Sequence, residues 1–218
     1  MSRPAVGLVL GAACALAVRA ASAQRVTIGP QFVLANYREV SSGLQYSGTG
    51  FGGAAVAHWR RFRAEAVVTR VTFNPSGGST TLQSFDATEI DAWLAYDVAP
   101  YASVEAGLTH RSPSPELGAQ GLGAVRVGAR AASEIGPGAT VSFRADYLAA
   151  PQFSGGGHAS LSLDLGLGLD MRLAGRIHAT AAYAFQHLDR KVNPGGTAPD
   201  TPAPIQQSLA RVGLGVAW

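Results

Sequence analysis

The sequence predicts an all-β protein, a single closed antiparallel transmembrane β-barrel of about ten strands, with eight strands as the alternative. Three observations lead to this prediction. Apolar residues alternate with small or polar ones almost throughout residues 24–218, and no stretch has the period of an amphipathic helix. The connections between the alternating segments are short and long in turn. The aromatic residues gather near the ends of the segments.

Ten alternating segments can be assigned, at 26–37, 50–60, 62–73, 85–98, 101–111, 121–134, 139–149, 159–173, 176–189 and 206–218. The clearest is 159–173, where one face carries only apolar residues, namely Leu161, Leu163, Leu165, Leu167, Leu169 and Met171. Segments of about ten residues suit tilted strands that cross a membrane. A soluble barrel or sandwich, with the apolar face turned inward, is the alternative.

The lengths of the connections predict the orientation of the barrel. Short turns are expected near Arg61, Pro100, Pro137 and Gly175, and long polar loops at 38–49, 74–84, 112–120, 150–158 and 190–205. Outer-membrane barrels have short periplasmic turns and longer external loops, and an even strand count leaves both termini in the periplasm. The four prolines of 190–205 predict that this segment stays unpaired and solvated.

The aromatic residues are expected to form two girdles around an apolar band. The periplasmic group comprises Trp59, Phe62, Tyr96, Tyr101, Phe143 and Trp218. The external group comprises Tyr37, Tyr46, Phe51, Phe73, Phe85, Tyr147, Phe153, Tyr183 and Phe185.

Two positions depart from regular alternation. Pro30 cannot donate to a ladder, so we expect the first strand to bulge or to start late there. In segment 62–73, Val68 shares a face with Phe62, but Phe73 lies on the other face. A bulge near Thr69 would restore the phase of that strand.

The first residues predict a secretory signal peptide over 1–23. Arg3 gives a basic start, residues 5–18 are almost entirely apolar, and Ala21 and Ala23 form an A-x-A cleavage site. A membrane anchor is disfavoured because the apolar run of about 14 residues is too short to span a bilayer. Cys14 leaves a lipoprotein as a further alternative. Cleavage after Ala23 would remove this only cysteine and leave 24–218 as one barrel domain.

Charge and motifs argue against several classes of function. Loss of Arg3 and Arg19 with the signal peptide lowers the formal net charge from +3 to +1, so the basic pI is not a sign of nucleic-acid binding. The sequence has no nucleophile elbow, no P-loop, no zinc-type histidine pair and no G-x-G-x-x-G motif that opens a helix. We therefore expect no catalytic residues, no cofactor, no metal and no nucleic-acid partner.

If the apolar faces meet lipid, the opposite faces line the lumen and carry equal numbers of arginines and carboxylates. These are Arg63, Arg111, Arg126, Arg130, Arg144, Arg172 and Arg211, with Glu65, Glu89, Asp91, Glu105, Asp146, Asp164 and Asp170. An unpaired charge is costly in a narrow barrel, so we expect a paired interior network, with Trp93 helping to fill the space. A conduction path is the alternative. Glu89 and Asp91, two residues apart on one face, could also share a proton.

The last eight residues resemble the C-terminal signal by which outer-membrane β-barrels are recognised for assembly. Arg211 and Gly213 take its polar and glycine places, and Val216 and Trp218 its hydrophobic and aromatic places. The resemblance implies a location in the bacterial outer membrane, reached by secretion through the inner membrane. It also implies the barrel-assembly machinery, outer-membrane lipid and lipopolysaccharide as partners.

In length, loop asymmetry and terminal signal, residues 24–218 resemble the small outer-membrane β-barrel group of OmpX-like and opacity-type proteins. This resemblance implies a non-enzymatic barrel that presents external loops for surface interaction or membrane support, toward an external ligand that the sequence does not name. A narrow solute channel is the alternative.

Residues 185–189 and 193–195 resemble part of the PagL-type lipid A deacylases, in which a His and a Ser two residues later lie on the outer face of the barrel. His187 would take the place of that His, but Asp189 stands at the Ser position, which removes the nucleophile of acyl transfer. Because of the position of His187, an outer-membrane lipid A hydrolase is kept as the second alternative. Otherwise His187 extends the aromatic girdle of Tyr183 and Phe185.

Overall fold

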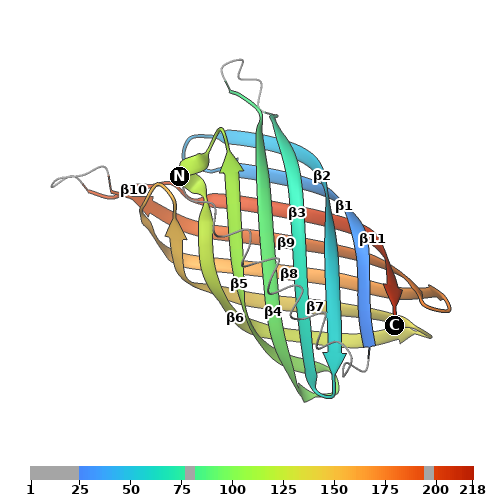
Figure 1. The fold of residues 1–218 in the computed structure, drawn as a ribbon. Coiled ribbons are helices and arrows are strands. Elements are labelled where there is room, and N and C mark those ends of the chain that lie inside the picture. The colour runs from blue at the N-terminus through green and yellow to red at the C-terminus, as the bar shows by residue number, and fades with distance from the viewer. Residues whose placement is uncertain (1–24, 77–81, 194–198) are drawn as a thin grey trace, which may run out of the picture.

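The chain folds into a closed antiparallel barrel of ten long strands, as the alternation predicts (Figure 1). The computed structural model describes residues 25–76, 82–193 and 199–218. The predicted signal peptide, with the cleavage residues Ala21 and Ala23, lies outside these ranges. Within them, no helix is long and apolar enough to cross a membrane.

Each long strand pairs with two others, so the sheet closes on itself. The long strands are β1 (Arg25–Glu39), β2 (Leu44–Trp59), β3 (Phe62–Pro75), β4 (Phe85–Ala99), β5 (Ala102–Ser114), β6 (Leu122–Gly136), β7 (Ala139–Phe153), β8 (His158–Ala174), β9 (Ile177–Val192) and β11 (Ile205–Ala217). Strand β11 lies between β9 and β1, and β9 also pairs with β8. The connections contain the short strand β10 (Thr201–Pro202) and the 3-10 helix η2 (Gly118–Gln120).

Two-residue turns connect β2 to β3, β4 to β5, β6 to β7 and β8 to β9, at the predicted positions and all at one end of the barrel. We call this end, where β1 begins, the turn end, and the opposite end the loop end. The loops at the loop end are shorter than expected because strands extend into them. The prediction that 190–205 stays unpaired was wrong: Thr201 and Pro202 pair with Val192 and Lys191.

Neither of the two expected irregularities occurs. Strand β1 starts at Arg25, and Pro30 pairs in register with Gly53 of β2. Toward β11 the ladder omits Gly29 and Pro30 but resumes in the same register, so one missing donor is tolerated without a bulge. Strand β3 pairs continuously with β2 and β4 through Thr69 and Arg70.

Large apolar side chains cover the outer face of the barrel. They include Ile28, Leu34, Leu94, Val104, Leu108, Val127, Leu163, Leu165, Leu167, Val212 and Leu214, each at least a third exposed. Their neighbours along the strands, such as Asp164 beside Leu165, face inward and are buried. An apolar band of this kind is the surface of a transmembrane barrel, and a soluble barrel would turn its apolar face inward.

The polarity of both faces reverses toward the loop end of β3. The outward residues of this strand are Ala64, Ala66, Val68, Arg70, Thr72 and Asn74, and the inward ones are Arg63, Glu65, Val67, Thr69, Val71 and Phe73. Since the register is continuous, the change lies in the surroundings of the strand and not in its phase. We infer that lipid meets the outer face up to Val68 and that water meets it from Arg70 onward.

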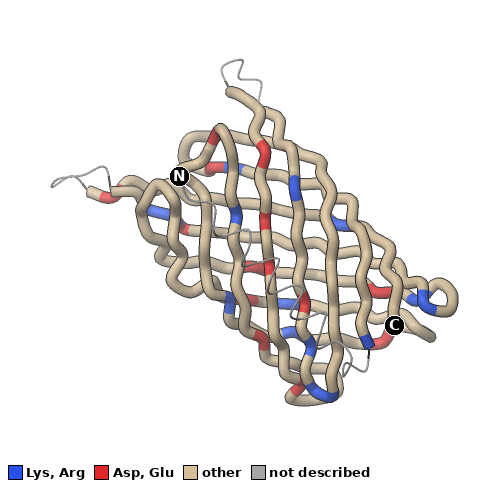
Figure 2. Tube along the Cα trace, in the orientation of Figure 1, with Lys and Arg blue, Asp and Glu red and all other residues tan. Residues whose placement is uncertain are grey.

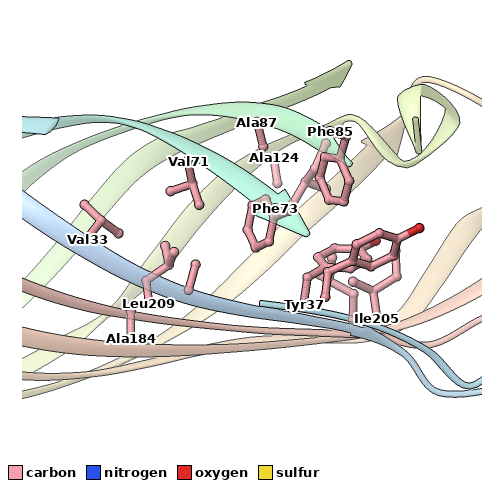
Figure 3. Packing of buried hydrophobic residues seen from close by; sticks show 14 of the residues in the cluster. Val33, Tyr37, Val71, Phe73, Phe85, Ala87, Ala124, Ala184, Ile205 and Leu209 are labelled. Atoms are coloured by element: carbon pink, nitrogen blue, oxygen red, sulfur yellow. The ribbon is translucent and has the colours of Figure 1, made fainter. Parts of the chain in front are cut away.

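The same reversal in β1, β2 and β4 creates a small apolar core inside the loop end. Its centre is Tyr37, Tyr46, Phe73 and Phe85, whose rings pack at centroid distances of 4.8–6.5 Å (Figure 3). These four rings and Phe153 point inward and are buried, so assigning them to an external girdle was wrong. Phe51, Tyr147 and Tyr183 do face outward.

Candidate functional site: the barrel interior

Charged residues lie along the strands as well as at the ends of the barrel (Figure 2). Arg126 of β6 is among the most buried of them, with a side chain that is 2% exposed. Its guanidinium nitrogens lie 2.7 Å from a carboxylate oxygen of Asp91, 2.8 Å from one of Asp164 and 3.2 Å from one of Asp146. Three strands thus direct carboxylates at one arginine, which removes the cost of burying it unpaired.

A second group of ion pairs extends from Arg126 toward the turn end. Arg144 of β7 lies 3.0 Å from Asp146 and 2.9 Å from Asp164. Arg130 pairs with Glu105 at 3.0 Å and with Glu65 at 3.3 Å. Glu65 is also bound by Arg63, at 2.5 Å.

A third group lies between Arg126 and the apolar core of the loop end. Arg211 of β11 lies 3.3 Å from Glu89, and the side-chain amide of Gln207 donates to the other oxygen of Glu89 at 2.8 Å. Arg111 donates to the side-chain oxygens of Gln207 and Gln186 and lies over the ring of Tyr37. Arg211 lies 3.6 Å from Asp91 as well, so Glu89 and Asp91 both take part in ion pairs with arginine, the role expected of them in the network.

Trp93 of β4 fills the middle of the lumen, as predicted. The guanidinium carbons of Arg126 and Arg144 each lie 4.5 Å from its ring centroid. Gly107 of β5 stands opposite Trp93, and a Cβ there would collide with the backbone of β4. The stacked indole and guanidinium planes close the central section of the barrel.

The lumen remains open on the turn side of Trp93. A cavity of about 310 Å³ lies there, lined by inward residues that include Arg25, His58, Arg63, Trp93 and Ser142. On the other side of Trp93, two pockets of about 10 Å³ lie among the third ion-pair group and the aromatic core. We call the larger cavity the vestibule.

Two predicted members of the network stand apart from it. Asp170 pairs with His178 of β9 at 2.8 Å, at the turn end, and has no ion pair with the arginines of the described interior. Arg172 is exposed and makes no ion pair within the described ranges, so its assignment to the network was wrong. Arg172 lies two residues before the end of β8 at the turn end, where its side chain is exposed to solvent.

Sequence reasoning missed His178 and Arg25. His178 is 3% exposed, and its Nε2 lies 2.6 Å from the guanidinium of Arg25 while its Nδ1 lies 2.8 Å from Asp170. This geometry assigns the proton to Nδ1, which donates to the carboxylate, while Nε2 accepts from Arg25. The alternation along β1 and β9 places both residues on the inward face, and this could have indicated them. Gln186 and Gln207 were missed because they carry no charge, and the network was selected by charge.

The four residues of the predicted assembly signal lie in β11 and just beyond it. Arg211 faces the lumen, Val216 and Trp218 face outward, and a Cβ at Gly213 would collide with the backbone oxygen of Pro30. Their role in assembly stays a prediction.

The outer face near the loop end carries two small polar groupings. Asp189 accepts a hydrogen bond from Ser160 at 2.5 Å, and the side-chain amide nitrogen of Gln206 lies 3.5 Å from Nδ1 of His187. A different pair, His110 and Ser112 of β5, has the His-x-Ser spacing, with Ser112 Oγ 2.9 Å from His110 Nε2. Among the described residues no cluster of His, Cys, Asp or Glu could hold a metal ion.

No protein family and no curated protein matches the chain by sequence. Its structure is similar to the translocator domain of the autotransporter NalP from Neisseria meningitidis, with a TM-score of 0.50, 13% identity, and coverage of 96% of this chain and 97% of that one. The chain has the fold of an outer-membrane β-barrel.

Two further solved structures are similar at lower TM-scores. One is an outer-membrane channel from Pseudomonas putida F1, with a TM-score of 0.48, 10% identity, and coverage of 88% of this chain and 95% of that one. The other is the attachment invasion locus protein Ail of Yersinia pestis, with a TM-score of 0.41, 14% identity, and coverage of 89% and 98%. At these identities the likeness concerns the fold alone.

Proposed function

We propose that the chain is an integral protein of the bacterial outer membrane, with its loop end outside, that does not conduct solutes. Its work would be done at the external rim, as a surface-interaction or membrane-support barrel. The observation that carries this proposal is the filling of the lumen on the loop side of Trp93, where two pockets of about 10 Å³ lie. Each is about the size needed for a single water molecule.

Two layers would block a solute in turn. The first is the charged layer, where Arg126 and Arg144 stack on Trp93 and hold carboxylates of several strands. The second is the aromatic core of Tyr37, Phe73 and Phe85. Opening a path requires separating buried ion pairs or displacing packed rings, and both are costly.

Hydrogen bonds hold parts of the loop end together. Gly155 donates its backbone N–H to the carbonyl of Ala119 at 2.8 Å, and Ser154 donates to Gly121 at 2.9 Å, so two loops are bonded to each other. Arg190 of β9 donates to the carbonyl of Gly156 at 2.9 Å and lies over the ring of Phe153. A rim ordered in this way is suited to presenting a fixed surface.

Planar-bilayer recording of the refolded barrel tests this proposal. We expect no unitary conductance steps from the native chain, and steps from a control variant that combines Trp93→Ala with Phe73→Ala and Phe85→Ala. Stable ohmic steps from the native chain would favour the solute-channel alternative and overturn the proposal.

The outer surface at the loop end suggests lipopolysaccharide as the neighbouring lipid. Outward polar side chains, among them Arg38 of β1 and Arg70 of β3, stand just beyond the apolar band. Phosphate groups of the outer leaflet would lie at this level, and arginine binds phosphate well. The barrel-assembly machinery remains a proposed partner on the basis of the C-terminal residues alone.

The lipid-hydrolase alternative rests on a specific observation as well. His110 Nε2 is placed to take the proton of Ser112 Oγ, and both side chains are exposed on the outer face near the loop end. Within the described residues, no carboxylate bonds to His110. Labelling with a fluorophosphonate distinguishes the two functions. If the native chain is labelled and Ser112→Ala abolishes the label, a hydrolase is favoured. Equal signals from the native chain and the variant would support the non-enzymatic proposal.

A further inference from the structure

The vestibule is a blind cavity of ligand size. Its volume of about 310 Å³ lies at the lower end of the range for small-molecule sites. Trp93 and the side chains stacked on it close the vestibule toward the loop end. Access is from the turn end, which the proposed orientation places in the periplasm.

Positive charge lines this cavity in excess. The lining includes five arginines and two carboxylates, namely Arg25, Arg63, Arg130, Arg144 and Arg211 with Glu65 and Asp170. The other carboxylates that pair with these arginines, among them Glu105 and Asp146, do not line the cavity. On the wall that a solute would touch, guanidinium groups therefore outnumber carboxylates.

Hydrogen-bond donors in the vestibule outnumber their acceptors. The Nε atoms of Arg63 and Arg211 are buried and have no hydrogen-bond acceptor in the described structure, and the side chain of Arg211 is 7% exposed. The hydroxyls of Thr27, Thr140, Ser142 and Thr180 also line the cavity. A buried donor without an acceptor is costly, so such a site favours a ligand that brings oxygen acceptors.

We propose that the vestibule binds a small oxyanion, a solute that carries a phosphate or carboxylate group and enters from the turn end. A cation does not suit the site, because arginines outnumber carboxylates on its wall by five to two. The bound oxyanion would accept from Arg63 and Arg211 and from the hydroxyls around them. Such binding does not depend on conduction, because the vestibule is closed at Trp93.

Trp93 provides a direct probe of the vestibule. The chain has three tryptophans, so Trp59→Phe with Trp218→Phe leaves Trp93 alone in the floor of the cavity. In detergent micelles we expect iodide to quench its fluorescence at least threefold more strongly than caesium, and inorganic phosphate to protect it from iodide. Equal quenching by the two ions, or no protection by phosphate, would overturn the proposal.

Calorimetric titration with inorganic phosphate, in a buffer without other oxyanions, measures the binding itself. Arg63→Gln should weaken phosphate binding about tenfold, the usual effect of losing one charge-assisted hydrogen bond. Glu65 keeps Arg130 in this variant, which protects the fold. The matched control is Arg70→Gln, which removes the same charge from the outer face. No binding to the native chain, or an equal loss in both variants, contradicts an oxyanion site in the vestibule.

Discussion

Replacing Arg126 by Met should destabilise the barrel more than any other single loss of charge. The guanidinium is bonded to Asp91, Asp146 and Asp164, and its side chain is 2% exposed. The variant leaves Asp146 and Asp164 with Arg144 and leaves Asp91 with Arg211 at 3.6 Å. Breaking a buried pair by removing one partner costs about 3–5 kcal/mol, because charge is left buried and underpaired.

Urea unfolding in phospholipid vesicles, followed by tryptophan fluorescence, measures this cost. The control is Arg70→Gln, whose partner Asp86 lies on the outer face with a side chain that is 40% exposed; exposed pairs contribute about 0–1 kcal/mol. Adding Asp91→Asn to Arg126→Met should restore part of the loss, since it removes one of the stranded charges. If Arg126→Met and Arg70→Gln destabilise the barrel equally, the interior pairs are solvated and the network is not what fills the lumen.

Three further predictions concern facing, packing and orientation. Leu165→Arg should lower the free energy of unfolding by about 2–4 kcal/mol if this outward residue lies near the middle of the bilayer; a change under 0.5 kcal/mol (roughly the noise of such measurements) would remove it from the lipid face. Phe73→Ala should cost about 3–5 kcal/mol as a buried ring, and Phe51→Ala, which is exposed, should cost less; the reverse order would contradict the inward aromatic core. An epitope inserted at Ser42, in the loop between β1 and β2, should be detected on intact cells, and detection only after permeabilisation would mean that the orientation is inverted.

The strands were predictable because period-2 alternation and turn signals act locally. All ten segments became strands, and every short turn lies where Arg61, Pro100, Pro137 and Gly175 mark it. The ends of the strands were less predictable. Pairing continues beyond the apolar band, where polar residues face out, and such a stretch has the composition of a loop.

The errors at Thr69 and in the external girdle have one physical cause. Alternation identifies two faces, but it does not say which medium each face meets. When the medium changes from lipid to water along β3, the apolar face changes with it, and the sequence looks as if the strand had slipped by one residue. The irregularity predicted at Pro30 was wrong for another reason: a single missing hydrogen-bond donor does not require a bulge.

The sequence predicted most residues of the interior network, but it did not predict which of them form ion pairs with one another. Inward parity selected Arg126, Arg144 and Asp164, but which strands lie within reach of one another across the lumen depends on closure and tilt. Arg172 has the inward parity, but it is exposed and makes no ion pair within the described ranges. Arg25 and His178 bond to each other at the turn end, because β1 and β9 both begin there.

Lipid and water accessibility along β3 tests most directly whether the barrel changes its surroundings between Val68 and Arg70. Single cysteines at Val68, Val71, Thr72 and Phe73 would carry a small fluorescent label, quenched in turn by brominated lipid and by aqueous iodide. We expect lipid to quench the label at 68, iodide to quench the label at 72, and neither to reach 71 or 73. Quenching by lipid at 71 and 73, with 72 protected, would mean that β3 slips by one residue and would contradict the reversal of polarity on which this account depends.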